Sequence, residues 1–434
     1  MFASVIISAG AAKRLKGGYP WVFSRDILSR RFQTAGVVGV LDKKGEFLGQ
    51  AFYSPASKIV LRLITKSKVK IDKNFWVERV RAALKRRLNN FPIPPLPATT
   101  TLAGRENGGM IDVPPFAKGG EGGFGSAFRV AYAESDGMPS IIIDKYSDIV
   151  SFQITSAGAE TVREDIVAAI AEVLRPAAII EKNNIQVRKL EGLQLIERVV
   201  FGDKTVTIVT EGDQRFEVDV LHGQKTGAYL DYRGFRLNPP FVKGGTGGIL
   251  ALDLFCYQGW MACHLAKNFA KVVAVDASQE AINIAERNAM LNGHKNIDFI
   301  CADAFEYLRG QATFYPSSIV EKKKVVCPLF DLIHLDPPPF AKGHKNLPVA
   351  IKAYKKMIIV ALKLLKPKGI FFVSSCSHHI SEGALEKIVQ EAAKVSGSKF
   401  QVIYRGIQDK DHPVLKGFPE SLYLKAIAIQ IMAL

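Results

Sequence analysis

Two stretches decide the fold of this chain: Phe330-Asp331-Leu332-Ile333-His334-Leu335-Asp336-Pro337-Pro338-Pro339-Phe340 and Gly369-Ile370-Phe371-Phe372-Val373-Ser374-Ser375-Cys376-Ser377. Each is a mostly apolar, strand-like run that is followed at once by a reactive side chain. The first run delivers a carboxylate, Asp336, and the second a thiol, Cys376. Apolar strands of this kind are typical of a parallel sheet that is covered on both faces.

The segments before these two runs alternate between strand and helix. We expect strands at 248–255, 271–275 and 297–301, and helices at 261–268 and 279–292. This alternation predicts a doubly wound, mostly parallel sheet of the Rossmann-like α/β class. Ligands of such sheets bind beyond the carboxyl ends of the strands. Five reactive side chains are expected at that edge: Asp253, Asp276, Asp303, Asp336 and Cys376.

The expected ligand is a nucleoside without a pyrophosphate. The turn after the first strand lacks Gly-x-Gly-x-x-Gly, so it offers no tight cradle for a pyrophosphate. Asp276 follows Asp253 by 23 residues, close to where a ribose-binding acid belongs. S-adenosylmethionine fits this pattern better than a dinucleotide does. Its predicted contacts here are Asp253, Phe255, Tyr257, Gly259, Asp276, Ala277, Asp303 and Ala304, although Asp303 also suits a helix cap.

The cysteine at the second strand end suggests attack on a pyrimidine ring. Carbon 5 of cytosine is a poor nucleophile, and a thiolate added to carbon 6 activates it. Asp336 would then hydrogen-bond the ring while Pro337, Pro338 and Phe340 hold it. Two alternatives stay open at this point. Cys376 would be a buried cysteine with no catalytic task, or the Asp-Pro-Pro loop would methylate an exocyclic amine without using a thiol.

Composition favours a large, basic, multidomain protein. The chain has 434 residues, 48% of them apolar, and a formal net charge of +17, which favours a polyanionic partner such as RNA. Many basic proteins nevertheless bind no nucleic acid. The five cysteines form no Cys-x-x-Cys pair, so we expect neither a metal site nor disulfides, and a cytoplasmic setting. Neither a signal peptide nor a membrane span is expected.

Two further domains are expected before the catalytic one. Residues 1–70 are predicted to form a small all-β unit, in which Lys13, Arg14 and Trp21 would contact RNA phosphates and bases. The alternative is that Trp21 belongs to the core. Residues 71–220 are predicted to be α+β, beginning with a basic-faced helix at 74–88 and followed by strands, and the catalytic domain would span 221–434.

One sequence element occurs three times. Pro-Pro-Phe-Ala-Lys-Gly stands at 114–119 and again at 338–343, and a close copy stands at 239–244. Only the copy at 338 follows a strand that ends in a carboxylate. The other two run into Gly-Gly-x-Gly-Gly, which suits a loose surface loop. We therefore interpret 105–126 and 239–248 as inserted loops.

Several segments together carry a family resemblance. They are Gly18–Phe23, Ala133–Pro139, Ile143–Tyr146, Gly223–Arg233, Asp253–Gly259, Asp336–Phe340, Ser375–Ser377, Asp411–Pro413 and Pro419–Lys425. In these segments the chain resembles the PUA-domain RNA cytosine-5 methyltransferases that act on large-subunit (23S) ribosomal RNA, which are class I Rossmann-like enzymes. The resemblance implies an RNA-binding PUA barrel, Cys376 as the nucleophile and 5-methylcytosine in ribosomal RNA as the product. It also implies that the segment containing Thr226 and Tyr229 helps to enclose the cofactor.

Two departures from the family pattern leave a third hypothesis open. Trp260 stands where the first cofactor motif usually has a second glycine, and the loop at 239–248 falls where a helix is expected. A protein that kept the fold and RNA binding but lost activity would show such changes. The sequence leaves open whether the chain forms a homodimer.

Overall fold

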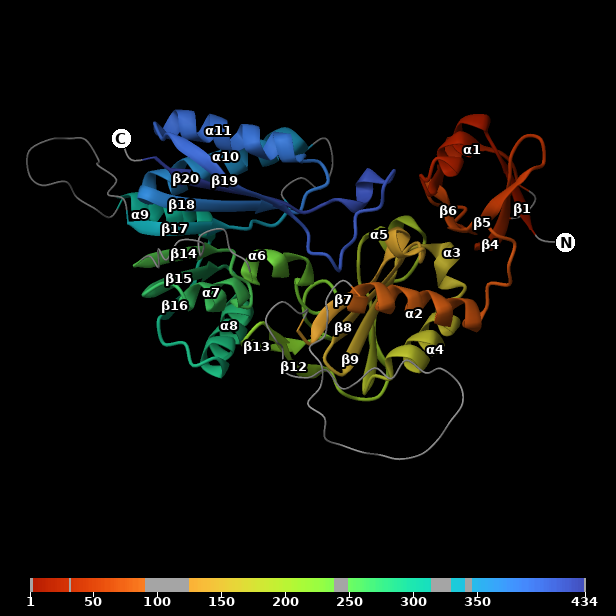
Figure 1. Cartoon of the computed structure of the whole chain (residues 1–434), viewed down its shortest axis with the longest axis horizontal. Coiled ribbons are helices and arrows are strands. Elements are labelled where there is room, and N and C mark those ends of the chain that lie inside the picture. Colours follow the sequence, from red (N-terminus) through yellow and green to blue (C-terminus); the bar gives the residue numbers. More distant parts are fainter. Residues whose placement is uncertain are drawn as a thin grey trace, which may run out of the picture. The chain divides into compact units, whose positions relative to one another are not determined.

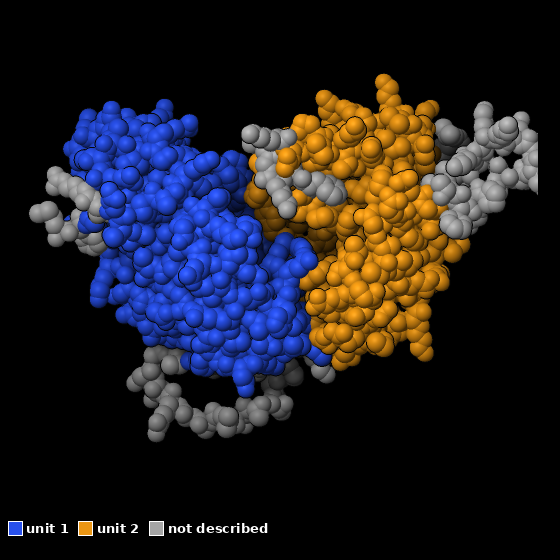
Figure 2. Space-filling view, turned by 180° about the vertical axis from the view of Figure 1, so that it is seen from behind, with its two compact units in different colours: residues 1–213, 218–230, 410–421 blue, residues 214–217, 231–409, 422–434 orange. Residues whose placement is uncertain are grey.

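The computed structural model describes residues 3–30, 33–89, 125–237, 249–313, 329–339 and 346–432. The chain forms two compact units (Figure 2). Unit 1 comprises residues 1–213, 218–230 and 410–421, and unit 2 comprises 214–217, 231–409 and 422–434. Unit 1 thus spans both predicted N-terminal domains. It also takes in 410–421, which the sequence had assigned to the catalytic domain.

The first part of unit 1 is a six-stranded sheet with the order β2-β6-β5-β4-β1-β3. The prediction of an all-β unit is wrong in one respect, because helix α1 (Ala9–Lys16) carries the basic residues Lys13 and Arg14. Ser8 caps this helix by accepting a hydrogen bond from the amide of Ala11. The strands are β1 (Ser4–Ile7), β2 (Trp21–Phe23), β3 (Ile27–Arg30), β4 (Gly36–Leu41), β5 (Phe47–Tyr53) and β6 (Ile59–Thr65).

The second part of unit 1 is a five-stranded sheet with the order β11-β10-β9-β8-β7, and two long helices, α2 and α4, pack together beside it. It confirms the predicted α+β block. The elements are α2 (Lys73–Asn89), β7 (Ala127–Tyr132), β8 (Ile141–Tyr146), β9 (Ile149–Ile154), α3 (Ala157–Glu160), α4 (Arg163–Leu174), β10 (Ala178–Asn183), α5 (Val187–Leu190) and β11 (Ile196–Phe201), followed by β12 (Val206–Glu211) and β13 (Gln214–Asp219).

The basic face predicted for α2 needs a correction at Arg87. This side chain is buried and forms two hydrogen bonds of 2.6 Å with the carboxylate of Asp136. It also donates to the carbonyl oxygen of Asp411. A guanidinium with such partners is satisfied inside the protein and cannot meet RNA.

Unit 2 contains a seven-stranded sheet with the order β16-β15-β14-β17-β18-β20-β19. Strands β14 to β18 are parallel to one another, and β20 is antiparallel to both β18 and β19. The predicted doubly wound, mostly parallel class is confirmed. The strands are β14 (Leu250–Leu254), β15 (Lys271–Asp276), β16 (Ile297–Cys301), β17 (Phe330–Leu335), β18 (Leu365–Ser375), β19 (Phe400–Ile407) and β20 (Lys425–Ile431).

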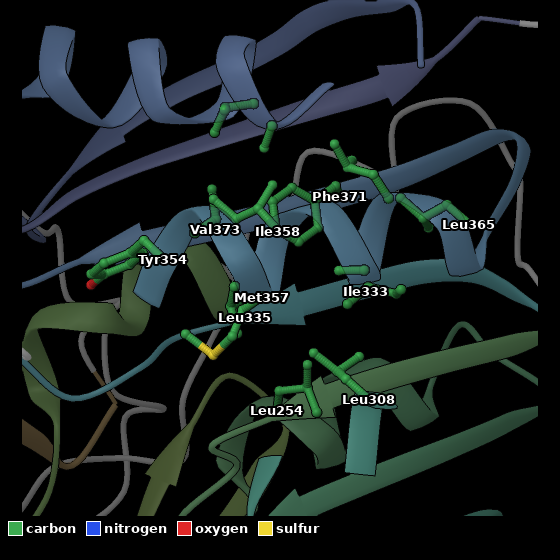
Figure 3. Close-up of a cluster of buried hydrophobic side chains, with 14 of the residues drawn as sticks. Leu254, Leu308, Ile333, Leu335, Tyr354, Met357, Ile358, Leu365, Phe371 and Val373 are labelled. Atoms are coloured by element: carbon green, nitrogen blue, oxygen red, sulfur yellow. The ribbon is translucent and has the colours of Figure 1, made fainter. Parts of the chain in front are cut away.

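Helices cover both faces of this sheet (Figure 1). Alternate residues of each strand point to opposite faces, so Leu252 and Leu254 join one core whereas Ala251 joins the other. The first core packs under α9 (Ala304–Thr313), α10 (Leu347–Leu364) and α11 (Glu382–Ser396), and Figure 3 shows Met357 and Ile358 of α10 beside Leu335 and Val373 of the sheet. The second core packs under α6 (Arg233–Leu237), α7 (Trp260–Ala266) and α8 (Gln279–Leu291).

Some predicted features lie outside the described residues. These are Phe340, the loop at 239–248 and all but the last two residues of the loop at 105–126. Within the ranges that the structure does describe, no helix has the length and apolar character that crossing a membrane requires. Nor do three or more His, Cys, Asp or Glu side chains of these ranges gather in a way that could hold a metal ion.

Candidate active site at the carboxyl edge of the sheet

The five reactive side chains predicted at strand ends do lie along one edge of unit 2. We call this the carboxyl edge, meaning the ends of β16, β15, β14, β17 and β18. Because these strands are neighbours and parallel, their ends follow the same order in space. Along the edge this order places Asp303, Asp276, Asp253, Asp336 and Cys376 in turn.

The turn after β14 has an unusual backbone that Asp276 supports. Phe255 and Tyr257 both adopt positive φ angles, 62° and 47°, which non-glycine residues rarely do. The carboxylate of Asp276 accepts a hydrogen bond of 2.9 Å from the amide of Tyr257 and one of 3.0 Å from the amide of Ser278. Asp276 was predicted to meet a ribose, and it also fixes the shape of the turn. Strained backbone of this kind is concentrated at ligand sites.

Gly259 and Trp260, at the end of this turn, pack against other parts of unit 2. Gly259 has φ of 75°, and a Cβ atom there would lie 2.8 Å from the Cβ of Ala285 on α8. Trp260 begins α7, and its buried ring stacks on Phe216 with the centroids 4.3 Å apart. The tryptophan that departs from the family pattern is therefore a packing residue. The glycine before it is required by its close approach to a helix.

Two buried oxygen atoms beside this turn have no hydrogen-bond partner among the described residues. They are Oδ2 of Asp253 and Oε1 of Gln258. Asp253 is fully buried, and its Oδ1 atom lies 2.6 Å from Nδ1 of His334. An unsatisfied buried oxygen is costly, so each of these atoms suits a ligand that brings a hydrogen-bond donor.

The residues predicted to surround adenine are arranged around the start of α9. Oδ1 of Asp303 accepts hydrogen bonds of 2.9 Å from the amides of Phe305 and Glu306, so this carboxylate caps the helix. Ala304 is buried next to it. The carbonyl oxygen of Ala277 accepts a weak hydrogen bond from the thiol of Cys301. Cys301 itself is exposed.

The two other predicted cofactor contacts belong to unit 1. Thr226 is buried, and its hydroxyl bonds to Asp144 and to the hydroxyl of Tyr146. Tyr229 donates to Gln224, and the ammonium of Lys225 lies over its ring. These contacts explain how both side chains are held. Their role toward a cofactor stays a prediction.

Asp336 directly follows β17 and is held by the neighbouring strand. The hydroxyl of Ser374, on β18, donates to Oδ1 of Asp336. Its backbone amide reaches the carbonyl oxygen of Leu254 on the other neighbouring strand, at 3.5 Å. Pro337 is buried and Pro338 is exposed. The carboxylate therefore has a fixed position at the edge of the sheet, with a rigid backbone on one side of it.

Cys376 directly follows β18 and is partly exposed between two buried serines. Nearby, the buried ammonium of Lys425 donates to the carbonyl oxygens of Ser377 and Tyr423, both at 2.7 Å. Burial lowers the pKa of Lys425 to about 8, and the negative charge of the Cys376 thiolate opposes that shift. A lysine that interacts with the thiolate favours its ionised, nucleophilic form. The sequence matched Lys425 to the family without giving it a role.

Tyr354 of α10 lies near both Cys376 and Asp336. Its hydroxyl donates to Oγ of Ser375 at 3.2 Å. Burial raises the pKa of Tyr354, and the negative charges of Cys376 and Asp336 act in the same direction. The tyrosine therefore stays protonated and keeps donating to Ser375. This residue was not singled out from the sequence.

The predicted RNA contacts lie in unit 1 and have different surroundings. Lys13 is exposed on α1, whereas Arg14 pairs with Asp26 at 2.5 Å. Trp21 is partly exposed, and its ring nitrogen donates to Glu134 at 2.9 Å. Its ring also meets Phe418 edge to face, with centroids 4.7 Å apart. Trp21 thus has structural contacts of its own, and base stacking stays a prediction.

Comparison with known proteins agrees with this arrangement. The PUA-like domain family matches residues 5–66, and a methyltransferase domain family matches residues 246–417. A relative named Ribosomal RNA large subunit methyltransferase I, from Photobacterium profundum, is 33% identical over 99% of this chain and 100% of its own length. The protein of the same name from Pseudoalteromonas translucida is 32% identical with the same coverage. The chain belongs to the ribosomal RNA large subunit methyltransferase I family.

Solved structures support the fold of this family member. A SAM-dependent methyltransferase from Streptococcus mutans matches 99% of this chain and 100% of its own, with 20% identity and a TM-score of 0.75. A methyltransferase complexed with SAH matches with the same coverage, 21% identity and a TM-score of 0.77. The predicted PUA-like and Rossmann-like methyltransferase fold is confirmed.

Proposed function

We propose that the protein transfers a methyl group from S-adenosylmethionine to carbon 5 of a cytosine in large-subunit ribosomal RNA. The observation that carries the proposal is the position of Cys376 at a strand end next to Asp336, with Lys425 close to its thiolate. The relatives named after methylation of this RNA support the substrate class. The net charge of +17 also suits a polyanionic substrate.

The carboxyl edge fits the proposed cofactor. Asp253 and Gln258 offer buried oxygens to hydrogen-bond donors, and the methionine part of the cofactor carries an ammonium group. Asp276, Ala277, Asp303 and Ala304 would hold the ribose and adenine. When bound, S-adenosylmethionine supplies an electrophilic methyl group.

The residues of the chain would act on the cytosine itself. The Cys376 thiolate adds to carbon 6, and the electron pair of the 5,6 double bond then makes carbon 5 nucleophilic. The ring nitrogen gains electron density in the same step, and Asp336 in its protonated form donates a hydrogen bond to it. After carbon 5 has been methylated and has lost its hydrogen to a base, the thiolate leaves and the double bond returns. Lys425 favours the thiolate that begins and ends this sequence.

Replacing Cys376 by alanine separates this proposal from methylation of an exocyclic amine. A cytosine-5 methyltransferase loses turnover on large-subunit ribosomal RNA, whereas an enzyme that methylates an exocyclic amine keeps it. The proposal further expects a covalent complex of the unchanged protein with RNA that contains 5-fluorocytosine, and none with the alanine variant. Bisulfite sequencing of the RNA locates the product.

Two controls complete the experiment. Cys301→Ser changes an exposed cysteine at the end of β16, which three strands separate from β18, and it keeps a hydrogen-bond donor. It should leave turnover near the starting value. Calorimetry with S-adenosylmethionine tests the hypothesis of an inactive RNA-binding protein. Absence of cofactor binding at millimolar concentration would exclude the proposed reaction.

A further inference from the structure

Asp253, His334 and Tyr232 form a hydrogen-bonded group inside unit 2. Nδ1 of His334 lies 2.6 Å from Oδ1 of Asp253, and its Nε2 lies 2.6 Å from the hydroxyl of Tyr232. Asp253 is fully buried, and 3% of His334 and 4% of Tyr232 are exposed. The other carboxylate oxygen, Oδ2, has no hydrogen-bond partner among the residues that the structure describes. The protein therefore satisfies one oxygen of this carboxylate and leaves the other able to accept.

The sheet aligns the imidazole with the carboxylate. In the parallel pairs β14–β17 and β17–β18, His334 is the register partner of Asp253 on one side and of Phe372 on the other. The imidazole contacts the rings of Phe372 and Tyr232, with centroids 5.3 and 5.5 Å apart. Contacts with both rings restrict rotation of the imidazole. The direction from which Oδ1 is held is fixed as a result.

This arrangement is costly if stability is its only purpose. A buried oxygen without a partner costs free energy, as does a buried histidine in a mostly apolar strand unless its nitrogens are paired. On the β15 side, the register partner of Asp253 is Ala274, whose methyl group has no donor to offer Oδ2. An apolar side chain in place of Asp253 would remove the cost. The half-satisfied carboxylate therefore suits a ligand that supplies the missing donor.

The hydroxyl of Tyr232 decides which ring nitrogen of His334 carries the proton. Burial raises the pKa of Tyr232 well above its usual range, so the phenol keeps its proton and can donate it to Nε2. In a neutral imidazole the proton then lies on Nδ1, which donates to Oδ1 of Asp253. Without the hydroxyl, the proton could lie on either nitrogen. Tyr232 thus acts on the carboxylate through the histidine.

We propose that His334 and Tyr232 are positioning residues that hold Asp253 with its Oδ2 atom toward the ammonium group of the cofactor's methionine part. The inference rests on the proposed function in its assignment of Asp253 to the cofactor, and not on the chemistry at Cys376. Because His334 occupies Oδ1, the ammonium group has one acceptor oxygen in one fixed place. The site should therefore favour a ligand that carries the ammonium group, and it should do so only while the histidine holds the carboxylate.

The test compares two ligands that differ only in the amino group: S-adenosylhomocysteine and its analogue without that group. Calorimetry with the whole protein gives the dissociation constant of each, and we call their ratio the ammonium preference. A general loosening of the cofactor site changes both constants alike and cancels in this ratio. The ammonium preference therefore reports on the carboxylate and not on overall stability.

Two variants of nearly equal shape, His334→Asn and His334→Leu, differ in the donor that they offer to Asp253. The asparagine amide can donate from near the place of Nδ1, whereas leucine has no donor. In the unchanged protein we expect an ammonium preference of about 10- to 100-fold, the size of one hydrogen bond to a charged group. His334→Leu should lower this preference by about tenfold, and His334→Asn should retain most of it.

Tyr232→Phe keeps the ring and removes the hydroxyl that fixes the proton on Nδ1. It should lower the ammonium preference by a smaller factor than His334→Leu does, because the imidazole can still donate part of the time. The control, Tyr404→Phe, removes a hydroxyl from another ring of the same aromatic cluster and should leave the preference unchanged. If His334→Leu does not fold, Tyr232→Phe and its control carry the test.

Three results would overturn the inference. An equal ammonium preference in folded His334→Leu and in the unchanged protein excludes a positioning role for His334. An equal loss in the asparagine and leucine variants assigns the effect to packing of the ring instead of to its hydrogen bond. Absence of any preference in the unchanged protein also removes Asp253 from the proposed cofactor site.

Failure of the proposed reaction has a different signature. Persistent methylation by Cys376→Ala refutes the cytosine adduct but leaves the ammonium preference of every variant at position 334 as predicted. The two failures are therefore distinguishable.

Discussion

Lys425 and Cys376 are coupled across the strand pair β18–β20. Lys425 is the register partner of Ser375, the residue before the cysteine, and its ammonium donates to the carbonyl oxygen of Ser377, the residue after it. The lysine thus spans the backbone on both sides of Cys376. Its buried charge is held beside the strand end where the thiolate forms.

Replacing Lys425 by methionine should raise the pKa of the Cys376 thiol. Below pH 8 or so Lys425 is charged and favours the thiolate, and above its pKa of about 8 that effect disappears. At pH 7 we expect alkylation of Cys376 by iodoacetamide to slow about tenfold, equivalent to roughly one pKa unit. At pH 9.5 the two proteins should react at similar rates. Working in a Cys301→Ser background removes the exposed thiol from the measurement.

Lys425→Arg is the matched control for charge, and it should retain most of the reactivity at pH 7. An alkylation rate that depends on pH identically in the methionine variant and the unchanged protein would show that Lys425 has no influence on the thiol.

Replacing Asp276 by asparagine should weaken cofactor binding. Both carboxylate oxygens support backbone amides of the strained turn, and the asparagine amide has only one acceptor oxygen. Loss of one charge-assisted hydrogen bond costs about 1.5–3 kcal/mol, so calorimetry should show a dissociation constant for S-adenosylmethionine roughly 10- to 100-fold higher.

The control is Asp298→Asn on the neighbouring strand. Asp298 forms an exposed ion pair with Lys271, and such pairs contribute little to stability. The affinity of the Asp298→Asn variant for the cofactor should therefore stay within about twofold of that of the unchanged protein. Equal affinities of the Asp276→Asn variant and the unchanged protein would remove Asp276 from the cofactor site.

The strands of unit 2 could be predicted because each is a continuous apolar run, and Asp336 and Cys376 could be found because they stand where such runs end. The hydrogen bonds of His334 with Asp253 and Tyr232 could not. His334 reads as one polar residue in a strand, and its partners Asp253 and Tyr232 are far from it in sequence. The pairing of β14 with β17 brings Asp253 next to His334, and Tyr232 comes from the short helix at Leu230–Tyr232.

Other omissions have similar causes. Lys425 acts on a cysteine whose strand pairs with β20, an antiparallel addition that strand and helix alternation does not predict. Arg87 has the helical spacing of a basic surface residue, yet its side chain is buried because it hydrogen-bonds Asp136 on a distant segment. Helix α1 has only eight residues, too few for a clear periodic pattern.

Replacing Gly259 by alanine should destabilise unit 2 more than the same change at Gly293. Both glycines have φ near 75°, a conformation that alanine adopts at a cost. Both variants should therefore lose about 1 kcal/mol of the free energy of unfolding for this reason. At Gly259 the new methyl group would also lie 2.8 Å from Ala285, whereas nothing lies within 4 Å at Gly293. We expect urea unfolding to show an additional loss of about 1–3 kcal/mol for Gly259→Ala. Equal losses at both sites would mean that α8 moves aside without cost.

The last prediction concerns Trp21, whose ring either stacks on RNA bases or belongs to the protein core. The two hypotheses predict different effects of replacing the ring. If RNA bases stack on the ring, Trp21→Phe keeps affinity within a few-fold and Trp21→Ala lowers it by about 1–3 kcal/mol. If the ring is core, Trp21→Ala lowers the free energy of unfolding while the folded fraction binds RNA normally. Both variants leave the partly buried carboxyl of Glu134 without the indole donor, so both should unfold at a lower temperature.

Lys13→Ala provides the comparison for Trp21, because its exposed ammonium can only act through charge. It should lower affinity for all RNA sequences and reduce the slope of log affinity against log salt by about one. A change of Trp21 should leave that slope alone. Filter-binding titrations at several salt concentrations, corrected for the folded fraction, therefore separate phosphate contact from stacking. An unchanged salt slope in Lys13→Ala would place the RNA away from helix α1.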